Sequence, residues 1–316
     1  MNTLVHHGLG IHALDSGYLR PSLDAIHIII EAGRAAVIDT GTNQSVPRVL
    51  AALAEAGIAP KHVDWVILTH IHLDHAGGAG LLMQRLPNAR LAVHPRGARH
   101  MADPSRLVAG VIAVYGEAAT RDMYGDILPI DKARITETPH EFVIALAGRE
   151  LLFLDTPGHA RHHVAIRDAK SGHIFAGDVF GISYRELDEG ARQFVFPTSS
   201  PVQFEPGPYH HSIDLIAALQ PGVVYNTHYS ALHDVQQKAA TLHRLVDAHA
   251  DIALREKDAG EDRYRRLLAG VEALALEEAR RFGSRLPDER ILEVYGMDIE
   301  LNAQGLGSWL DALSNA

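Results

Sequence analysis

Four side chains that can bind a metal ion fall within six residues: His70, His72, Asp74 and His75. They directly follow residues 63–69, an apolar run that predicts a buried strand. Because side chains at positions i and i+2 of an extended segment point the same way, His70 and His72 can bind one ion. Beyond them the chain turns toward a helix, so that Asp74 and His75 face a neighbouring position where a second ion can bind. This spacing is hard to explain by packing and predicts a metal site.

Three more ligand-type side chains follow predicted strands in the same manner. His159 comes after residues 151–154, Asp178 comes after residues 173–176, and His228 comes after residues 223–225. In sheet proteins, ligands gather where the strands end at one edge. Each of the three signals is weak alone, but together they predict the remaining ligands of a two-metal site.

The order His-x-His-x-Asp-His, followed by a His, an Asp and a His, resembles the pattern of the metallo-β-lactamase superfamily. The resemblance covers about residues 20–230. It implies an α/β fold in which two sheets lie face to face between helices, an αββα four-layer sandwich. It also distributes the ligands over two ions, with His70, His72 and His159 on the first, Asp74, His75 and His228 on the second, and Asp178 bridging them.

Asp39 matches the early aspartate of the same family. The resemblance implies that Asp39 lies behind the metal ligands and orients one of them, or the loop that carries it. A strand-end aspartate that caps the turn at Thr40 explains the residue equally well. Three residues near ligands in the sequence are candidates for substrate contacts, although packing or solvation explains each of them more simply: Tyr184, Arg185 and Tyr229. His162, close to His159 in the sequence, is a fourth candidate, as a residue that lines the pocket.

A two-metal site of this kind predicts hydrolysis. Two ions that share one water lower its pKa toward neutrality, so that hydroxide becomes the nucleophile. We expect Asp74 to be catalytic, because it can orient the hydroxide and relay its proton. Direct metal contact also stabilises an anionic tetrahedral intermediate. We therefore expect a metal-dependent hydrolase that acts on an ester, a thioester or a lactone.

Variation within the superfamily narrows this expectation. Several lactamases place Cys where Asp178 stands, and the diiron oxygen reductases carry Glu where His72 stands. The sequence is therefore more similar to the glyoxalase II and lactonase-like hydrolases. The glutathione-binding features of glyoxalase II are not recognisable after Asp178, which leaves the substrate open. The alternatives are a small-molecule phosphodiesterase, a mononuclear-iron oxidoreductase of the persulfide dioxygenase type, and a ligand-binding effector with little turnover.

The composition restricts the cofactor and the partners. The 316 residues include 21 histidines and no cysteine, which excludes disulfides, thiolate nucleophiles and Cys-rich zinc sites. Imidazole and carboxylate ligands suit zinc, iron or manganese, so we expect two divalent ions, zinc before the others. The formal net charge of −10 disfavours nucleic acid as a partner. No signal peptide or bilayer-spanning run is visible, so we expect a cytoplasmic protein with a small-molecule substrate and no membrane partner.

The predicted elements divide the chain in two. Short strands alternate with helices at first, and helices dominate after residue 230. We expect a catalytic domain over residues 1–230, with a helical insertion at about 96–126, and a C-terminal helical extension over residues 231–316. A helix over residues 103–123 is predicted within the insertion, where it can act as a lid or cover a sheet edge. Its apolar face consists of Leu107, Val108, Val111, Ile112 and Tyr115. The C-terminal helices can cover the site or join subunits into a homo-oligomer.

Overall fold

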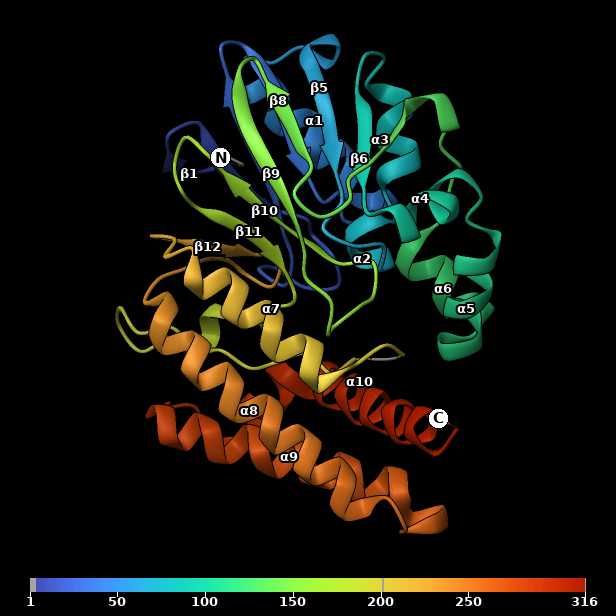
Figure 1. The fold of residues 1–316 in the computed structure, drawn as a ribbon, viewed down its shortest axis with the longest axis vertical. Helices are drawn as coiled ribbons and strands as arrows, with labels where there is room; N and C mark the ends of the chain where they lie inside the picture. The colour runs from blue at the N-terminus through green and yellow to red at the C-terminus, as the bar shows by residue number, and fades with distance from the viewer. Residues whose placement is uncertain (1–3, 201, 316) are drawn as a thin grey trace. The chain divides into compact units, whose positions relative to one another are not determined.

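The structure, a computed structural model, describes residues 4–200 and 202–315. The chain divides into two compact units, which we describe separately. Unit 1 comprises Met1–Asp155 and His162–Gly177, and unit 2 comprises Thr156–Arg161 and Asp178–Ala316. Figure 1 labels most of the helices and strands of the two units. Each unit consists of two separate stretches of the chain, so the units do not test the domain boundary expected after residue 230, which stays a prediction.

Unit 1 contains a mixed sheet whose strands lie side by side in chain order. These strands are β1 (Val5–Gly8), β2 (Ile11–Asp15), β3 (Ala25–Glu31), β4 (Arg34–Ile38), β5 (Val63–Ile67), β6 (Arg90–Val93) and β7 (Ile135–Glu137). The strands from β1 to β4 pair antiparallel, and those from β4 to β7 pair parallel. Parallel pairing places the carboxyl ends of β4 and β5 at one edge, where Asp39 and His70 follow.

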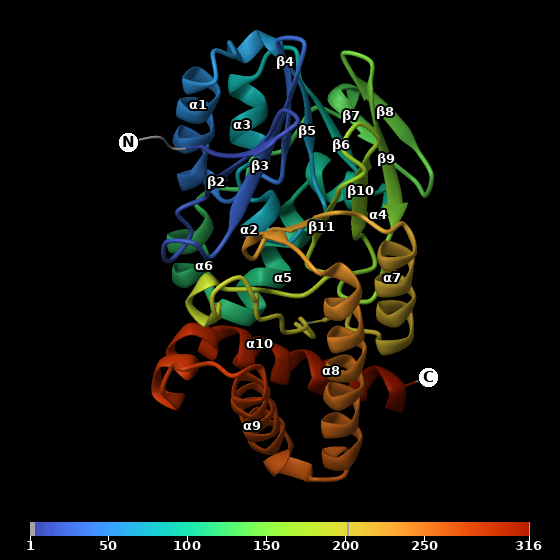
Figure 2. The same ribbon diagram turned by 90° about the vertical axis from the view of Figure 1, so that its left-hand side faces the viewer.

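Helices on one face of this sheet complete the core of unit 1. α1 (Val46–Glu55) and α3 (Ala79–Arg85) lie in the crossovers that parallel strands require. Val49 of α1 and Leu82 of α3 belong to the same buried apolar cluster as Val37 and Val66 of the sheet. Figure 2 shows the two helices side by side along the strands. Burying one such side chain contributes about 1.5–3 kcal/mol, so the cluster fixes the strand ends that precede the candidate ligands.

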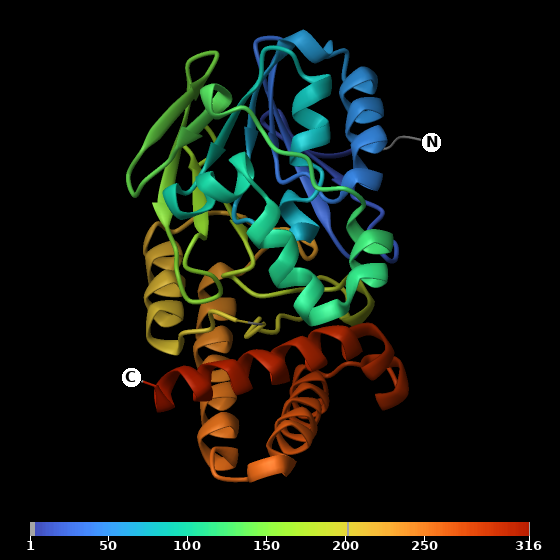
Figure 3. The ribbon, with the colours of Figure 1, turned by 90° about the vertical axis from the view of Figure 1, so that its right-hand side faces the viewer.

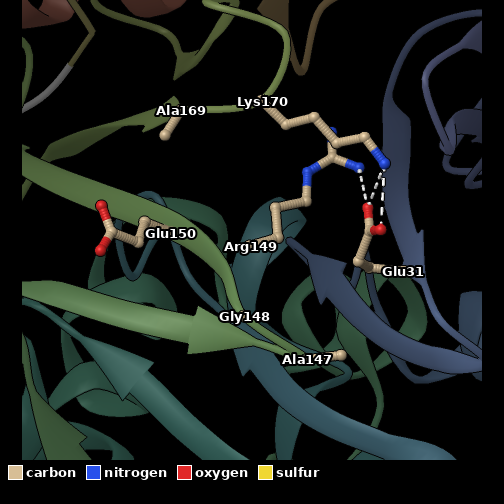
Figure 4. A pocket seen from close by; sticks show the side chains of 7 residues that line it. All are labelled: Glu31, Ala147, Gly148, Arg149, Glu150, Ala169 and Lys170. Atoms are coloured by element: carbon tan, nitrogen blue, oxygen red, sulfur yellow. Dashed lines mark hydrogen bonds and ion pairs between the residues drawn. The ribbon is translucent and has the colours of Figure 1, made fainter.

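A second, antiparallel sheet in unit 1 is joined to the first by a buried arginine. Its strands in unit 1 are β8 (Val143–Leu146), β9 (Arg149–Asp155), β10 (Val164–Asp168) and β11 (Ile174–Gly177). Arg149 donates to the two carboxylate oxygens of Asp168 at 2.7 and 2.5 Å, and to the carbonyl of Leu9 at 2.7 Å. Figure 4 shows Arg149 and Lys170 beside Glu31, at the end of β3. The contacts to Leu9 and Glu31 reach the first sheet, so Arg149 connects both layers.

The helical insertion differs from the single helix predicted over residues 103–123. After α4 (Pro95–Ala102), the chain forms α5 (Ser105–Tyr115) and α6 (Glu117–Tyr124). They are separated by Gly116, whose φ of +82° lies outside the helical region and favours glycine. The predicted apolar face of α5 is correct in direction, because its five residues are the half-buried ones and the rest are exposed. Figure 3 shows α5 and α6 meeting at an angle.

Unit 2 is mostly helical. Its elements are α7 (Pro206–Ala218), β12 (Val224–Asn226), β13 (Ser230–Leu232), α8 (Val235–Glu256), α9 (Arg263–Phe282) and α10 (Asp288–Ser314). β12 and β13 form a hairpin that ends at Leu232 and so includes the first two residues of the predicted C-terminal extension. The predicted helices then follow, and α10 packs against both α8 and α9. Within the described residues, each helix is too short or too polar to cross a membrane.

Candidate metal centre

In unit 1, His70 and His72 face each other through ring nitrogens. β5 ends at Ile67, two residues before the predicted end; the chain bends at Thr69, and His72 has an extended backbone. His70 Nε2 and His72 Nδ1 lie 2.9 Å apart, and the two ring planes are 80° from parallel. His70 is fully buried. The segment after β5 therefore turns the two imidazoles toward each other, and their binding of one ion stays a prediction.

Asp39 lies behind His75 and His70. Its Oδ2 accepts a hydrogen bond from His75 Nδ1 at 2.9 Å. Thr69 donates its amide to Asp39 Oδ1 and its hydroxyl to Oδ2, both at 2.9 Å. The Thr69 hydroxyl in turn lies 3.2 Å from His70 Nδ1. Asp39 thus contacts His75 directly and His70 through Thr69; that it orients metal ligands in this way stays a prediction.

The short helix α2 (Leu73–Ala76) presents Asp74 beside His75. Asp74 Oδ2 lies 3.4 Å from His75 Nε2, and Asp74 is partly exposed whereas His75 is buried. The His75 carbonyl accepts hydrogen bonds from the amide and the hydroxyl of Thr40. At Gly78, a Cβ would lie 2.6 Å from the Thr42 carbonyl, so glycine permits this close approach. α2 is therefore packed against the loop that follows Asp39.

In unit 2, one carboxylate oxygen faces two imidazoles. Asp178 Oδ2 lies 3.6 Å from His159 Nε2 and 3.4 Å from His228 Nε2. All three side chains are buried. The three residues come from loops far apart in the sequence, yet the fold of unit 2 brings them together. Each of the three follows a strand, and their membership of a common metal site stays a prediction.

Thr198 and Tyr209, which were not among the predicted site residues, contact His159 and Asp178. His159 Nδ1 donates to Thr198 Oγ1 at 2.8 Å, and the Thr198 hydroxyl donates to the Asp178 carbonyl at 3.3 Å. The Tyr209 hydroxyl donates to the same carbonyl at 3.2 Å. Gly158 has a φ of +128°, and a Cβ there would lie 2.3 Å from Tyr209 Cα. The loop before His159 therefore packs directly against α7.

The donor atoms fit a bound metal ion in chemical type and orientation. In His70, His75 and His159, Nδ1 faces an oxygen, which leaves Nε2 as the donor toward a metal. In each case Nε2 faces another imidazole or carboxylate of the cluster. Metal-binding histidines are typically held this way, with the second ring nitrogen on an oxygen partner. Imidazole and carboxylate donors suit zinc, iron and manganese.

The four candidate substrate contacts lie in different surroundings. Tyr184 is fully buried and donates to Asp298 at 3.2 Å, and burial lowers the pKa of Arg185, which donates to the Ser183 carbonyl at 3.1 Å. The amide of Tyr229 donates to the same carbonyl at 3.4 Å. His162 lies beside His70 and His72, with its ring centroid 6.2 and 5.6 Å from theirs. A substrate contact by any of the four stays a prediction.

A buried tyrosine pair in unit 1 was also missed. The hydroxyls of Tyr18 and Tyr124 lie 3.0 Å apart, and their rings stack with centroids 5.8 Å apart. Burial raises the pKa of both phenols, and the negative charge of Asp74 raises each further. The pair joins the loop after β2 to the end of α6. Residues this distant in sequence give no motif that sequence analysis could find.

Comparison with known proteins gives a family. The family model of the metallo-beta-lactamase superfamily matches residues 25–242. A metallo-beta-lactamase fold-containing protein of Sulfurisphaera tokodaii, ST1585, is 25% identical over 69% of this chain and 78% of that protein. Hydroxyacylglutathione hydrolases of Stenotrophomonas maltophilia and Xanthomonas euvesicatoria are 33% and 29% identical over 52% and 57% of this chain. Those matches span about half of the length of each hydrolase, 48% and 55%.

Solved structures show the same fold. The structure of ST1585 from Sulfolobus tokodaii has a TM-score of 0.63 at 21% identity and covers 95% of this chain and 98% of that chain. The metallo-beta-lactamase family protein TTHA1429 from Thermus thermophilus has a TM-score of 0.62 at 23% identity and covers 96% and 94%. These similarities confirm the fold class expected from the sequence, an α/β sandwich followed by C-terminal helices.

Proposed function

The chain belongs to the metallo-beta-lactamase superfamily, and we propose that it is a metal-dependent hydrolase of an ester, a thioester or a lactone. The observation that carries the proposal is the orientation of the histidines. Nδ1 of His75 in unit 1 faces an Asp39 oxygen, and Nδ1 of His159 in unit 2 faces the Thr198 oxygen. In each ring, Nε2 faces a carboxylate oxygen, that of Asp74 for His75 and that of Asp178 for His159. A buried imidazole that served only packing would not need this double arrangement.

We assign the ligands as the family pattern does. His70, His72 and His159 would hold one ion, Asp74, His75 and His228 would hold the second, and Asp178 would bridge them. The contacts within each unit support this assignment, since Asp178 Oδ2 faces both His159 and His228. We propose zinc as the first candidate for the metal, with iron and manganese as alternatives.

Asp74 is the residue to which we assign proton transfer. Bound divalent ions would supply acidified water and Lewis acidity at the substrate carbonyl. Asp74 is partly exposed and can therefore meet a substrate, unlike the buried His75 next to it. Its carboxylate would hold the proton of the attacking water and pass it to the oxygen or sulfur that leaves. Asp39 keeps its neighbour His75 in place throughout, because it accepts the His75 Nδ1 hydrogen bond.

An acyl substrate is the class that the relatives favour. Two of the similar proteins are named hydroxyacylglutathione hydrolase, and the name gives both an acyl group and hydrolysis. About a third of the residues are identical over about half of this chain, which is too little to infer that its substrate also contains glutathione. We therefore propose a small acyl compound in which the bond to oxygen or sulfur is broken by water.

The test combines metal analysis with a substrate screen. Purified protein is assayed by elemental analysis and against p-nitrophenyl esters, acyl thioesters, lactones and a phosphodiester. We expect acyl hydrolysis that is lost on chelation and restored by a divalent ion. Turnover of the phosphodiester alone would overturn the acyl assignment. One iron per chain with oxygen uptake would instead show an oxidoreductase.

A variant tests the role of Asp74. Asp74→Ala should lower turnover by at least about a hundredfold, which is the usual contribution of a positioned acid–base group. It should still retain at least one metal ion per chain. His211→Gln, at an exposed histidine of α7, is the matched control and should keep full activity. Full activity of Asp74→Ala would refute the mechanism.

A further inference from the structure

We propose that α10 is part of the candidate metal centre, with Asn302 as a positioning residue that acts through Thr198. Thr198 contacts the candidate ligands His159 and Asp178, and all four residues belong to unit 2. The C-terminal helices would thus contribute to the site itself. The inference rests on the metal ligands of the proposed function and is independent of the substrate.

Asn302 binds the backbone on both sides of Thr198. Its Oδ1 accepts a hydrogen bond from the Ser199 amide at 2.7 Å, and its Nδ2 donates to the Pro197 carbonyl at 3.2 Å. The Ser199 amide belongs to the peptide after Thr198, and the Pro197 carbonyl belongs to the peptide before it. The Asn302 side chain is buried, so solvent does not compete for these bonds. The two bonds therefore fix the backbone of Thr198 from both ends.

This pair of bonds requires the carboxamide of Asn302. A carboxamide offers an acceptor and a donor side by side, whereas an ionised carboxylate offers acceptors only. The buried segment 197–199 lies outside the strands and helices, so no sheet or helix supplies its backbone bonds. Buried backbone groups need partners, and Asn302 supplies one to each side of Thr198.

The fixed backbone directs the Thr198 hydroxyl at two candidate ligands. Thr198 Oγ1 lies 2.8 Å from His159 Nδ1 and 3.3 Å from the Asp178 carbonyl oxygen. A threonine side chain has few staggered positions, so the place of its oxygen follows from the place of its backbone. An oxygen partner on the second ring nitrogen orients a metal-binding histidine. Asn302 therefore acts on His159 through Thr198.

Gly305 of α10 lets the helix approach closely enough for these bonds. Gly305 and Asn302 are three positions apart, so they lie on the same face of the helix. A Cβ at Gly305 would lie 1.5 Å from the Ser199 carbonyl oxygen, far inside van der Waals contact. The Ser199 hydroxyl also donates to the Asn302 carbonyl at 3.3 Å. Figure 3 shows the segment before α7, in yellow, running beside α10.

The experiment measures the Zn²⁺ affinity of the whole chain by competition with a chelator. Asn302→Leu has a similar shape but lacks both hydrogen bonds, so we expect the affinity to fall roughly tenfold. A double-mutant cycle with Thr198→Val tests the route of the effect. Because Asn302 acts through Thr198, the double variant should bind Zn²⁺ as weakly as Thr198→Val alone.

Two glycines of α10 separate positioning from helix stability. Gly305→Ala should lower the Zn²⁺ affinity as Asn302→Leu does, because its methyl group would displace Ser199. Gly296→Ala is the matched control, since its Cβ would meet no described atom within 4 Å beyond its own helix, and the affinity should stay unchanged. Alanine favours a helix over glycine in both variants, so a weaker helix cannot explain a loss confined to Gly305→Ala. The visible spectrum of the Co²⁺-loaded protein should change in Gly305→Ala and Asn302→Leu only.

Three results would overturn the inference. Wild-type Zn²⁺ affinity in Asn302→Leu would show that α10 does not position the ligands. Losses that multiply in the double variant would show that Asn302 acts by a route other than Thr198. A wild-type protein without affinity for divalent ions would refute this inference and the proposed function together. Metal binding without acyl hydrolysis would instead refute the hydrolase alone, and the comparison of variants would remain decisive.

Discussion

Replacing Arg149 by methionine should be among the most destabilising single changes in unit 1. The Arg149 and Asp168 side chains are 1% and 0% exposed, and they form two hydrogen bonds of 2.7 and 2.5 Å. Methionine fills much of the same space but leaves the Asp168 carboxylate buried without its cation. Removing one partner of such a pair costs about 3–5 kcal/mol. Asp168 retains hydrogen bonds from Ser171, so we expect a value near 3 kcal/mol.

The loss of unfolding free energy in Arg149→Met should depend on pH in a defined direction. Burial alone would raise the pKa of Asp168, but hydrogen bonds from Arg149 and Ser171 outweigh it and lower that pKa. A carboxyl with a lowered pKa in the folded state stabilises the protein above its unfolded pKa. This stability is lost as the pH falls through the folded pKa. The difference between wild type and Arg149→Met should therefore be largest near pH 7 and shrink toward pH 3.

The assay is urea unfolding of both proteins at pH 7 and at decreasing pH, with a double-mutant cycle. Asp168→Asn should cost less in the Arg149→Met background than in wild type, because the buried charge is already uncompensated there. Glu31 keeps its contact with Lys170 at 2.7 Å, so its loss of Arg149 contributes little. If Arg149→Met changed the unfolding free energy by less than about 1 kcal/mol at pH 7, the buried-pair reasoning would be refuted.

Three further changes test other contacts. Thr198→Val removes the oxygen that holds His159 Nδ1, so metal affinity measured by competition with a chelator should fall roughly 10–100-fold, whereas Thr198→Ser should restore it. Burial lowers the pKa of His249 to about 3. Below about pH 6.5 the unfolded protein therefore binds a proton at His249 and the folded protein does not, which lowers stability. His249→Phe should reduce this loss of stability between pH 7 and pH 4, measured by urea unfolding. Gly158→Ala should destabilise unit 2 and weaken metal binding together, because its Cβ would collide with Tyr209; an unchanged melting temperature would contradict the packing described for this loop.

The sequence predicts the central strands well, because most of their side chains are apolar and buried or half-buried. β5 and β9 end or begin within two residues of the runs 63–69 and 151–154 that predict them. β1 and β7 were missed, and their side chains are largely exposed, so they lack an apolar run. The single helix predicted over residues 103–123 failed at Gly116, since a glycine with positive φ breaks a helix whose apolar spacing continues on both sides.

The same contrast explains which site residues could be found. The facing of His70 and His72 was predictable because the two residues are two positions apart, directly after a predicted strand. The oxygen behind His70 belongs to its neighbour Thr69, whereas the one behind His159 belongs to Thr198, thirty-nine residues further along. No local pattern reports a contact of that separation.

The histidine pair of α7 and α8 shows the limit most clearly. His210 and His243 are 33 residues apart on two helices, and on a helix the direction of a side chain becomes meaningful only once the partner helix is placed. Each histidine, taken singly, resembles an ordinary surface residue of an amphipathic helix. Their facing nitrogens arise from the packing of α7 on α8. Candidate ligands that follow strand ends can therefore be found in the sequence, whereas contacts between two packed helices need the structure.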